Sequence, residues 1–409
     1  MRPVVSVLPL LLVATPTVAQ IQGPPLTLEA AIEQARRTNP SAAAANAGID
    51  AASAARRVAG LRPNPTVAVD VENVGGSRAF DIVEAPKQTV SLAYPLELGG
   101  KRSARIGVAD ALGARAAIGR ASADAELQLA VTQAYTDALA ADRRLGTAEE
   151  QARIAAAGLR AAQVRVKAGR ASPLEESRAE VVRTNTDVVA EQAARLATAA
   201  RATLALRIGG AANGPLDSAW FDRIDAAVTR PGSGALTVAA ARADVASATA
   251  RERLARSQRI PDVTVSAGVR RVPMVGSSAV VLGVTVPLPF FNSGRAALDQ
   301  ARAERGQAEA LARAAELDAE QAVIKAQAER DNAASAARAA TGPTLAVARE
   351  AARIVRIGYR EGKFGQLDLL DAERALAETK VAAIDALATY HDAQAQLDRL
   401  TTPYVGATK

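Results

Sequence analysis

The sequence predicts a mainly α-helical protein with a small β part, in which a unit of helix, β-hairpin and long helix occurs twice. Three observations lead to this fold class: an internal repeat, long stretches of heptad pattern, and four short runs in which apolar and polar residues alternate. Aromatic residues make up only 3% of the 409 residues, and charged residues 23%. A chain rich in alanine and arginine with so few aromatics is typical of long helices that pack through small side chains.

The N-terminus predicts a secretory signal peptide over residues 1–19. Arg2 supplies a positive charge, Val4 to Val13 form an apolar run, and Thr17-Val18-Ala19 offers a cleavage site with small residues. The apolar run is about half of the ~20 residues that a membrane-spanning helix needs. We therefore expect an exported mature chain without a transmembrane helix.

The mature chain reads as a duplication. Residues 166–180 (VKAGRASPLEESRAE) and 359–373 (YREGKFGQLDLLDAE) match at a constant spacing of 193 residues. Upstream, the segment 65–67 (PTV) matches 261–263 (PDV) at a spacing of 196, and 94–96 (YPL) matches 286–288 (VPL) at 192. These matches predict two structural repeats, residues 20–208 and 235–402, joined by a connector over 209–234 that is rich in Gly, Pro and Asp. Residues 403–409 would form a C-terminal tail.

Each repeat is expected to begin with a helix, over 28–59 in the first and 237–259 in the second. We then expect a β-hairpin at about 66–96 and about 263–287, a continuous long helix at 104–169 and 296–362, and a return helix at 173–208 and 366–401. At 1.5 Å per residue, each long helix would reach roughly 100 Å. The first one carries apolar residues at alternating steps of four and three, which is typical of a left-handed coiled coil: Leu127, Val131, Ala134, Ala138, Ala141, Leu145, Ala148, Ala152 and Ala155.

The four strand-like runs are predicted at 66–73, 88–96, 263–271 and 279–287, each with one apolar face. Their length approaches the ~9–11 residues that cross a bilayer as a strand. A sheet in a membrane must close on itself, because every backbone polar group needs a partner. Four strands are too few, since single-chain barrels begin at about eight, whereas three copies would supply twelve. A small soluble sheet on a helical stalk is the alternative.

The composition argues against chemistry within one chain. No cysteine is present, and His391 is the only histidine, so neither a catalytic triad nor a metal site built from Cys or His can be assembled. We therefore expect no enzyme activity, no metal site and no cofactor. The net charge of +7 does not predict a nucleic-acid partner, because arginine and glutamate alternate along helices and few aromatics are available for stacking.

Several segments resemble the outer-membrane factors of tripartite efflux pumps, the TolC family, over essentially the whole mature chain. The turns AGRASPLEE (168–176) and EGKFGQLDLLDAE (361–373) are similar to that family's helical tips. RPNP (62–65), VENVGG (71–76), PLELGGKRSAR (95–105) and VPLPFFNSG (286–294) resemble the heavy-metal branch typified by the CzcC (cobalt-zinc-cadmium) channel.

The resemblance implies a homotrimer, in which a 12-stranded β-barrel in the outer membrane is continued by a periplasmic α-helical coiled-coil barrel. It implies the outer-membrane channel of a tripartite RND-type efflux system, a passive export duct across outer membrane and periplasm, with heavy-metal cations as the expected cargo. The implied partners are outer-membrane lipid, a periplasmic adaptor (membrane fusion) protein and, indirectly, an inner-membrane RND pump. A channel for drug efflux or type I protein secretion remains an alternative, and so does a periplasmic coiled-coil adaptor or scaffold.

Site residues also follow from the resemblance. Tyr359, Asp368 and Asp371 match the family's constriction and gating positions, and the tip residues Gly169, Arg170, Gly362 and Lys363 would contact the adaptor. Phe364 stands where the family has a basic residue that helps to close the tip, with Lys363 adjacent. Two Asp at positions i and i+3 lie on one helix face, so threefold repetition would place six carboxylates around a narrow pore and favour cations. The alternative is a solvated helix start, where Asp suits the positive end of the helix dipole.

Overall fold

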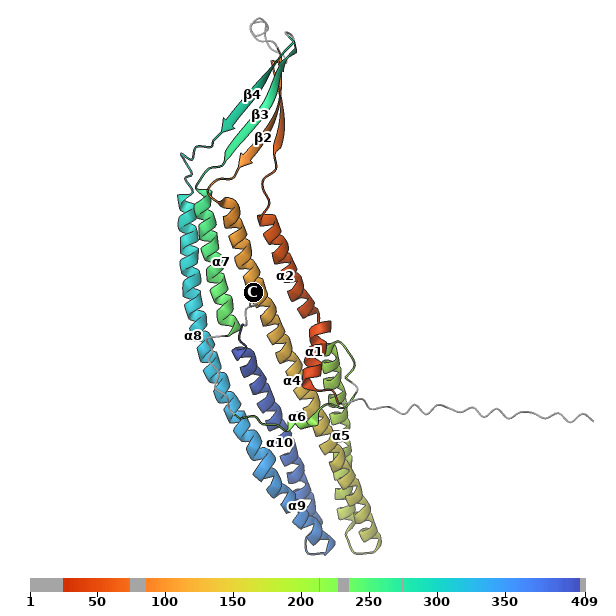
Figure 1. The fold of residues 1–409 in the computed structure, drawn as a ribbon. Coiled ribbons are helices and arrows are strands. Elements are labelled where there is room, and N and C mark those ends of the chain that lie inside the picture. The colour runs from red at the N-terminus through yellow and green to blue at the C-terminus, as the bar shows by residue number, and fades with distance from the viewer. Residues whose placement is uncertain (1–24, 74–85, 213, 227–234, 274–275, 405–409) are drawn as a thin grey trace, which may run out of the picture.

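The computed structural model describes residues 25–73, 86–212, 214–226, 235–273 and 276–404. The predicted signal peptide, residues 1–19, lies outside these ranges, as do residues 405–409 of the expected tail. Figure 1 shows an elongated, gently curved molecule with a sheet at one end, long helices along its length and two helical hairpin tips at the other end. Among the described residues, no helix combines the length and the apolarity needed to cross a membrane.

The helices follow the order expected for two repeats. The first half contains α1 (Leu28–Thr38), α2 (Pro40–Ala59), α4 (Lys101–Lys167) and α5 (Pro173–Ile208). A short α6 (Ser218–Phe221) lies between the halves. The second half contains α7 (Leu236–Gln258), α8 (Arg295–Ala339), a π-helical turn (Ala340–Thr344), α9 (Leu345–Arg360) and α10 (Gln366–Thr401).

The first helix was predicted as one continuous element over 28–59, and this was wrong. The chain breaks at Asn39, whose side-chain oxygen accepts a hydrogen bond from the N–H of Ser41 at 2.9 Å. Pro40 occupies the first position of α2, where its missing N–H costs nothing. The same proline cannot continue α1, because its ring would clash with the preceding turn.

The second long helix was predicted to be continuous over 296–362, and this was also wrong. The π-helical turn interrupts it at Gly342 (φ −93°, ψ −105°), and Pro343 follows inside the turn. Proline removes one helix hydrogen bond and displaces the carbonyl four residues earlier, which opens the helix locally. The matching positions in the first half are Glu149 and Glu150, and α4 is unbroken there.

The predicted seam on α4 is largely buried. Of its nine residues, those with a buried side chain are Leu127, Val131, Ala134, Ala138, Ala141, Ala148 and Ala155. α4 packs along both α5 and α10, so it holds the two halves together. The largest core cluster lies at mid-length, where Tyr135, Tyr390 and Phe221 are almost fully buried. We call this region the waist.

The four strands form one antiparallel sheet in the order β1 (Thr66–Glu72), β2 (Lys87–Leu96), β3 (Val263–Val272) and β4 (Ser277–Thr285). The register places Val69, Val90, Val269 and Val280 side by side across all four strands. One face is therefore apolar from edge to edge, and the other carries mainly small or polar residues such as Ser91, Gly268 and Gly283.

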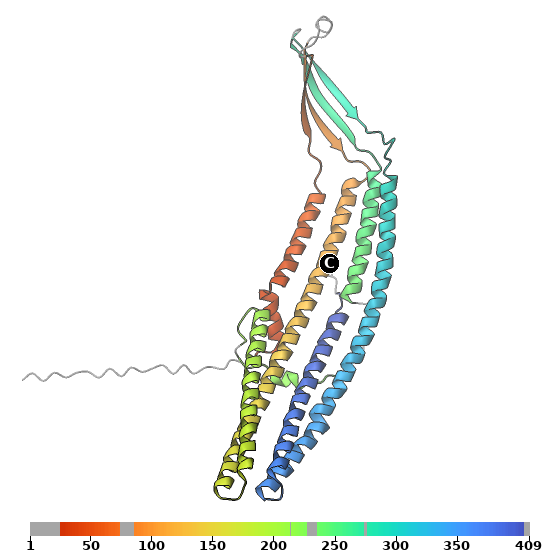
Figure 2. The same cartoon turned by 180° about the vertical axis from the view of Figure 1, so that it is seen from behind.

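On two opposite sides of the molecule, the outermost strand and helices have no neighbouring element beyond them. Figures 1 and 2 show β1, α2 and α5 along one side and β4, α8 and α9 along the other. Within the described residues, β1 pairs only with β2, and β4 pairs only with β3. The structure is therefore an open, curved wall with two free edges.

Candidate pore constriction at the helical tips

The two helical tips are built as the same turn. Gly169 (φ 66°) and Gly362 (φ 76°) both adopt the left-handed conformation that ends a helix. One residue later, the N–H of Arg170 donates to the carbonyl of Arg165, and the N–H of Lys363 donates to that of Gly358, both at 2.8 Å. A side chain at either glycine would meet no atom, so the positive φ and not the available space requires glycine there.

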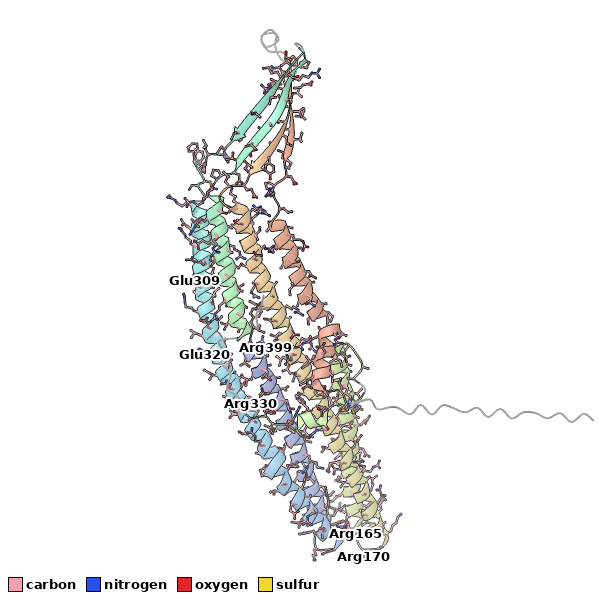
Figure 3. All side chains as sticks on the ribbon, viewed as in Figure 1. Arg165, Arg170, Glu309, Glu320, Arg330 and Arg399 are labelled. Carbon is pink, nitrogen blue, oxygen red and sulfur yellow. The ribbon has the colours of Figure 1, made fainter. Side chains whose placement is uncertain are left out.

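Tyr359 connects the two tips. Its hydroxyl accepts a hydrogen bond of 3.2 Å from Arg165 Nη1 on α4, and the guanidinium lies 5.8 Å from the centre of its ring. Arg165 also lies 3.4 Å from the carboxylate of Glu175 on α5. Figure 3 places Arg165 and Arg170 at the end of the first hairpin. The sequence match identified Tyr359, but nothing in the sequence pointed to Arg165 as its partner.

Asp368 and Asp371 lie on the exposed face of the first turns of α10. The carboxylate of Asp368 accepts a hydrogen bond of 2.9 Å from the N–H of Gly365, which caps the helix. Within one chain, Asp368 therefore stabilises the start of α10, which is the role expected of an Asp at a solvated helix start. Within the described residues, the hydrogen bonds of Tyr359 and Asp368 go to Arg165 and Gly365 and not to each other. One copy of the chain brings Tyr359 to the first hairpin but does not gather the two carboxylates with it.

Phe364 fills the place where the family has a basic residue. Its ring lies against the backbone of Gly358, where a Cβ atom would come within 2.1 Å of it. The second tip is therefore closed internally by an aromatic contact. The first tip has Arg165 and Ala171 at the matching positions, so the two tips share a backbone but differ in their side chains.

An ion pair with a buried carboxylate lies about two helical turns above the second tip. Glu373 on α10 is only 3% exposed, and the guanidinium of Arg356 on α9 donates two hydrogen bonds to it. The hydrogen bond to Glu373 raises the pKa of Arg356. Sequence comparison of the halves marked Glu373 only as the match of Glu180, and it gave no sign of the arginine.

Three further ion pairs join α4 to α10, two of them between the tips and the waist and the third on the sheet side of the waist. Lys380 Nζ lies 2.5 Å from Glu150, Arg144 Nη2 lies 2.5 Å from Asp385, and Arg399 pairs with Glu126. These side chains are partly exposed to solvent, so each pair contributes about 1 kcal/mol or less. We call them the α4–α10 ion pairs.

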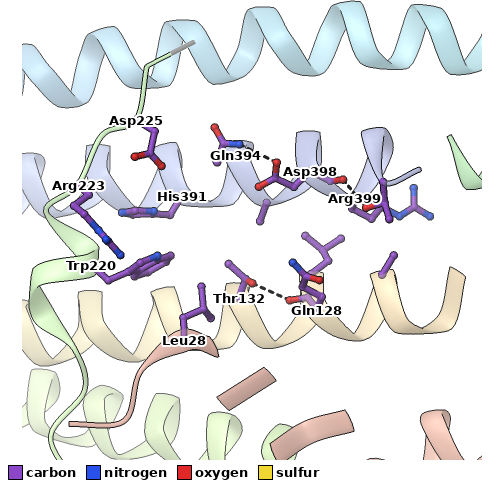
Figure 4. Close-up of a pocket in the computed structure, with 14 residues that line it drawn as sticks. Leu28, Gln128, Thr132, Trp220, Arg223, Asp225, His391, Gln394, Asp398 and Arg399 are labelled. Carbon is purple, nitrogen blue, oxygen red and sulfur yellow. Dashed lines mark hydrogen bonds between the residues drawn. The ribbon is translucent and has the colours of Figure 1, made fainter. Parts of the chain in front are cut away.

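The single histidine has a structural environment at the waist. His391 Nε2 lies 2.9 Å from the carbonyl of Phe221, and its ring stacks on Trp220 at 4.1 Å. Burial lowers the pKa of His391 and favours the neutral ring. A cavity of about 150 Å³ lies beside it (Figure 4), with Arg223 and Asp225 at one end. Among the described residues, no group of three or more His, Cys, Asp or Glu side chains is placed to hold a metal ion.

Two buried side chains anchor the connector to this waist. The Tyr135 hydroxyl donates to the carbonyl of Leu26 at 2.6 Å and accepts from the N–H of Asp217 at 2.9 Å. The guanidinium of Arg330, 3% exposed, donates to the carbonyls of Asp225 and Ala226. Both halves therefore hold the connector through polar groups that the repeat pattern did not reveal.

Comparison with known proteins agrees with this architecture. The family model "Outer membrane efflux protein" matches residues 31–210 and 233–402. The cobalt-zinc-cadmium resistance protein CzcC of Cupriavidus metallidurans is 31% identical over 386 residues, 92% of this chain and 90% of that protein. The nickel and cobalt resistance protein CnrC of the same organism is 32% identical over 275 residues, 66% of this chain and 65% of that protein.

A solved structure shows the same fold. The open state of the Neisseria gonorrhoeae MtrE outer membrane channel superimposes with a TM-score of 0.75 at 21% identity, over 91% of this chain and 88% of that one. The predicted fold class and outer-membrane location are confirmed. Because the family model covers both halves, the chain belongs to the outer membrane efflux protein family and is an outer-membrane efflux channel that extends into the periplasm.

Proposed function

We propose that three copies of this chain form a passive duct that exports heavy-metal cations across the outer membrane and periplasm. The observation that carries the proposal is the sheet, which has one apolar face and two unpaired edges. Burying apolar surface is worth roughly 25 cal/mol per Å², so a face of exposed valines favours lipid over water. Unpaired strand edges are not tolerated in lipid, so the edges need partners from further copies.

The helices support the same assembly. On α5, Leu174, Val181 and Val188 form an exposed stripe at a spacing of seven. On α9, at the opposite edge, Val347 and Ile354 are exposed at the same spacing. A spacing of seven is that of a coiled-coil seam. Two different edges that complement each other favour head-to-tail contact, which closes into a ring.

Gating in this proposal involves Tyr359, Asp368 and Asp371. The Arg165–Tyr359 hydrogen bond ties the second tip to the first, and its loss would free the second hairpin to move. Asp368 and Asp371 are exposed, so three copies can present six carboxylates to a common axis and favour cations.

The tip turns supply the surface for the adaptor. Gly169, Arg170, Gly362 and Lys363 are exposed at the end of the molecule that is far from the sheet. The two tips share one backbone conformation, so six turns with the same backbone would face the adaptor in a trimer. The adaptor would in turn connect the duct to an RND pump in the inner membrane.

Heavy-metal cargo is supported by the names of the relatives, which are resistance proteins for cobalt, zinc, cadmium and nickel. In this proposal the duct performs no catalysis and holds no resident cofactor, and the pump selects the cargo. Deleting the gene should sensitise cells to one or more of these metals. On fractionation of cells, the protein should be found in the outer membrane as a trimer. Sensitivity to drugs but not to metals would show that the duct exports drugs and not metals. A soluble monomer would overturn the proposal of a trimeric duct.

A further inference from the structure

The apolar face of the sheet is shorter than the apolar band of a membrane. In β3 the apolar run goes from Val263 to Val269, which is ~20 Å at ~3.4 Å per residue. At the ~40° tilt of strands in membrane barrels, this run is only ~15 Å tall, against an apolar band of ~25 Å. Away from the helices the face ends at Arg271, which shares a row with Gln88 and Ser278. Further apolar surface is therefore needed at the end of the sheet that adjoins the helices.

The next apolar residues on that side belong to the segment that joins β4 to α8. β4 ends at Thr285, two residues before the predicted end of this strand, and residues 286–294 follow with the sequence VPLPFFNSG. Phe290 is 82% exposed, and Phe291 is fully exposed. Figure 1 shows the segment at the border between the sheet and the helices. It therefore lies where the apolar face of the sheet needs to be extended.

The segment is held in its conformation by bonds of its own. The N–H of Gly294 donates to the side-chain oxygen of Asn292 at 3.0 Å. Arg259, which follows α7, donates from Nε to the carbonyl of Ser293 at 3.4 Å. Two prolines restrict the backbone further. The fold thus fixes two aromatic rings in solvent, and such an arrangement is unfavourable unless an apolar partner covers them.

The first half has no such feature at the matching place. Gly100 and Gly294 precede α4 and α8 in the same left-handed conformation. Three residues lie between Leu96 and Gly100, none of them aromatic, whereas five lie between Leu288 and Gly294, including both phenylalanines. The segment of the second half is therefore longer by two residues and is the aromatic one. We call residues 288–293 the aromatic loop.

The charges beside the aromatic loop also differ from those of the first half. Lys101, the first residue of α4, lies 2.8 Å from the carboxylate of Asp262. Arg295 is the first residue of α8, and at the repeat spacing of 196 the counterpart of Asp262 is Thr66, which carries no charge. Arg259 and Arg295 are exposed, and neither forms an ion pair within the described residues. Two unpaired cations beside an exposed apolar loop complement the phosphate groups of an anionic lipid surface.

We propose that the aromatic loop enters the periplasm-facing leaflet of the outer membrane, and that Arg259 and Arg295 bind phosphate groups of anionic phospholipids beside it. The inference rests on the proposed duct, because the loop meets lipid only if the apolar face of the sheet lies in the membrane. A second copy of the chain is the competing partner for the loop. Thr66 of such a copy offers no carboxylate to Arg295, so the charges favour lipid.

The chain has no cysteine, so a single introduced cysteine carries the only spin label. The test uses the full-length protein in vesicles of phosphatidylcholine and phosphatidylglycerol. K363C at the second tip is the aqueous reference, and V280C on the apolar face of the sheet is the lipid reference. Because apolar surface partitions into the acyl chains, the ratio of oxygen to nickel-chelate accessibility should be roughly fivefold higher at F291C than at K363C.

V280C also separates this inference from the proposed function. A lipid signal at V280C with an aqueous signal at F291C overturns the lipid contact of the aromatic loop and leaves the duct intact. Aqueous signals at both positions overturn the placement of the sheet in the membrane, and with it the duct. A label at F291C that neither reagent reaches would show that protein covers the loop, and this result also overturns the inference.

The two arginines are tested with spin-labelled lipids. Phosphatidylglycerol should associate with the wild-type protein roughly threefold more strongly than phosphatidylcholine, as expected for arginines at a membrane surface. R259Q/R295Q should abolish this preference, whereas R313Q/R349Q, which removes two exposed arginines farther from the sheet, should keep it. R295Q alone should weaken the preference while leaving the bond of Arg259 to Ser293 in place. An unchanged preference in R259Q/R295Q would overturn the phosphate contact.

Discussion

Arg165 and Tyr359 stand 194 positions apart in the chain, and the guanidinium of the first donates to the hydroxyl of the second at 3.2 Å. This hydrogen bond joins the tip of the first half to the tip of the second. The two helical hairpins therefore touch directly, through polar groups, close to their tips. We expect it to hold the tips together in the closed duct.

Replacing Tyr359 with Phe should therefore favour the open duct. The variant keeps the ring and removes the hydroxyl, which is worth about 1 kcal/mol, so the open population should rise roughly fivefold. Single-channel conductance in planar bilayers measures this population. Arg178→Ala, which removes an exposed arginine from α5, is the control and should leave conductance unchanged. Equal conductance of Y359F and wild type would exclude this bond as a gate.

Neutralising Asp368 and Asp371 together should weaken cation selectivity. Asn at 368 keeps an oxygen that can cap the N–H of Gly365, so the helix start should survive. The reversal potential in a salt gradient should move toward zero as six charges leave the trimer. The double variant Glu361→Gln with Glu378→Gln removes the same number of exposed charges from the same region. If both double variants shift the potential alike, the two aspartates do not form the constriction.

Arg356→Ala should destabilise the second hairpin through the buried carboxylate of Glu373. Removing the arginine leaves the buried carboxylate of Glu373 without a partner, and we expect a loss of about 2 kcal/mol, because Arg356 itself is half-exposed. Arg353→Ala is the control, because Arg353 pairs with Glu350 on the exposed face of the same helix, and its loss should cost much less stability. Thermal unfolding of the two variants measures the difference, and equal melting temperatures would contradict the prediction.

Asp392 should make stability depend on pH. Burial, with a smaller contribution from Asp137, raises the pKa of Asp392 from 3.8 to about 6. The folded state thus holds this proton more tightly than the unfolded state. The contribution of Asp392 to stability therefore falls as pH rises from about 4 to about 6 and then levels off.

Asp392→Asn should remove this slope and stabilise the protein at neutral pH on the order of 1 kcal/mol, allowing for partial solvent screening. Asp137→Asn should flatten the slope only partly, since repulsion is the smaller cause. Melting temperatures between pH 4.5 and 7.5 test both variants. A slope that is the same in wild type and D392N would show that other groups set the pH dependence.

Pro343→Ala should close the interruption between α8 and α9. Alanine restores the missing N–H and relieves the clash with the preceding turn. Amide hydrogen exchange around residues 340–347 should slow by roughly fivefold, as expected for about 1 kcal/mol of added local stability. Pro173→Ala is the control, because Pro173 starts α5, where no helix bond is missing. Unchanged exchange in P343A would place the cause in Gly342 alone.

Much of the fold was accessible from local pattern. The runs of period two predicted all four strands, because apolar and polar residues alternate along a strand that has one apolar face. The α4 seam and the matched tip turns were equally visible, since glycine at 169 and 362 marks the same left-handed helix end. The two helix breaks also have local causes, Pro40 and Pro343, because proline does not fit the interior of a helix.

The contacts across the repeat were not accessible. Arg165 with Tyr359, Arg356 with Glu373 and Arg330 with the connector each join residues whose sequence spacing carries no period. The sequence does not distinguish an arginine whose side chain is solvated from one whose side chain is paired with another residue. Only the crossing of α4, α9 and α10 in space decides which carboxylate or hydroxyl it meets.

The sequence by itself determined the duplication, the class of each element, the tip turns and the family resemblance, because each of these depends on residues close together in the chain. The tertiary structure decided the rest: that four strands join in one sheet with an apolar face, that both edges of the wall stay open, and that polar side chains from both halves meet at the tips and waist. These features depend on distances between segments some 200 residues apart, which the packing of whole helices sets and no local pattern records.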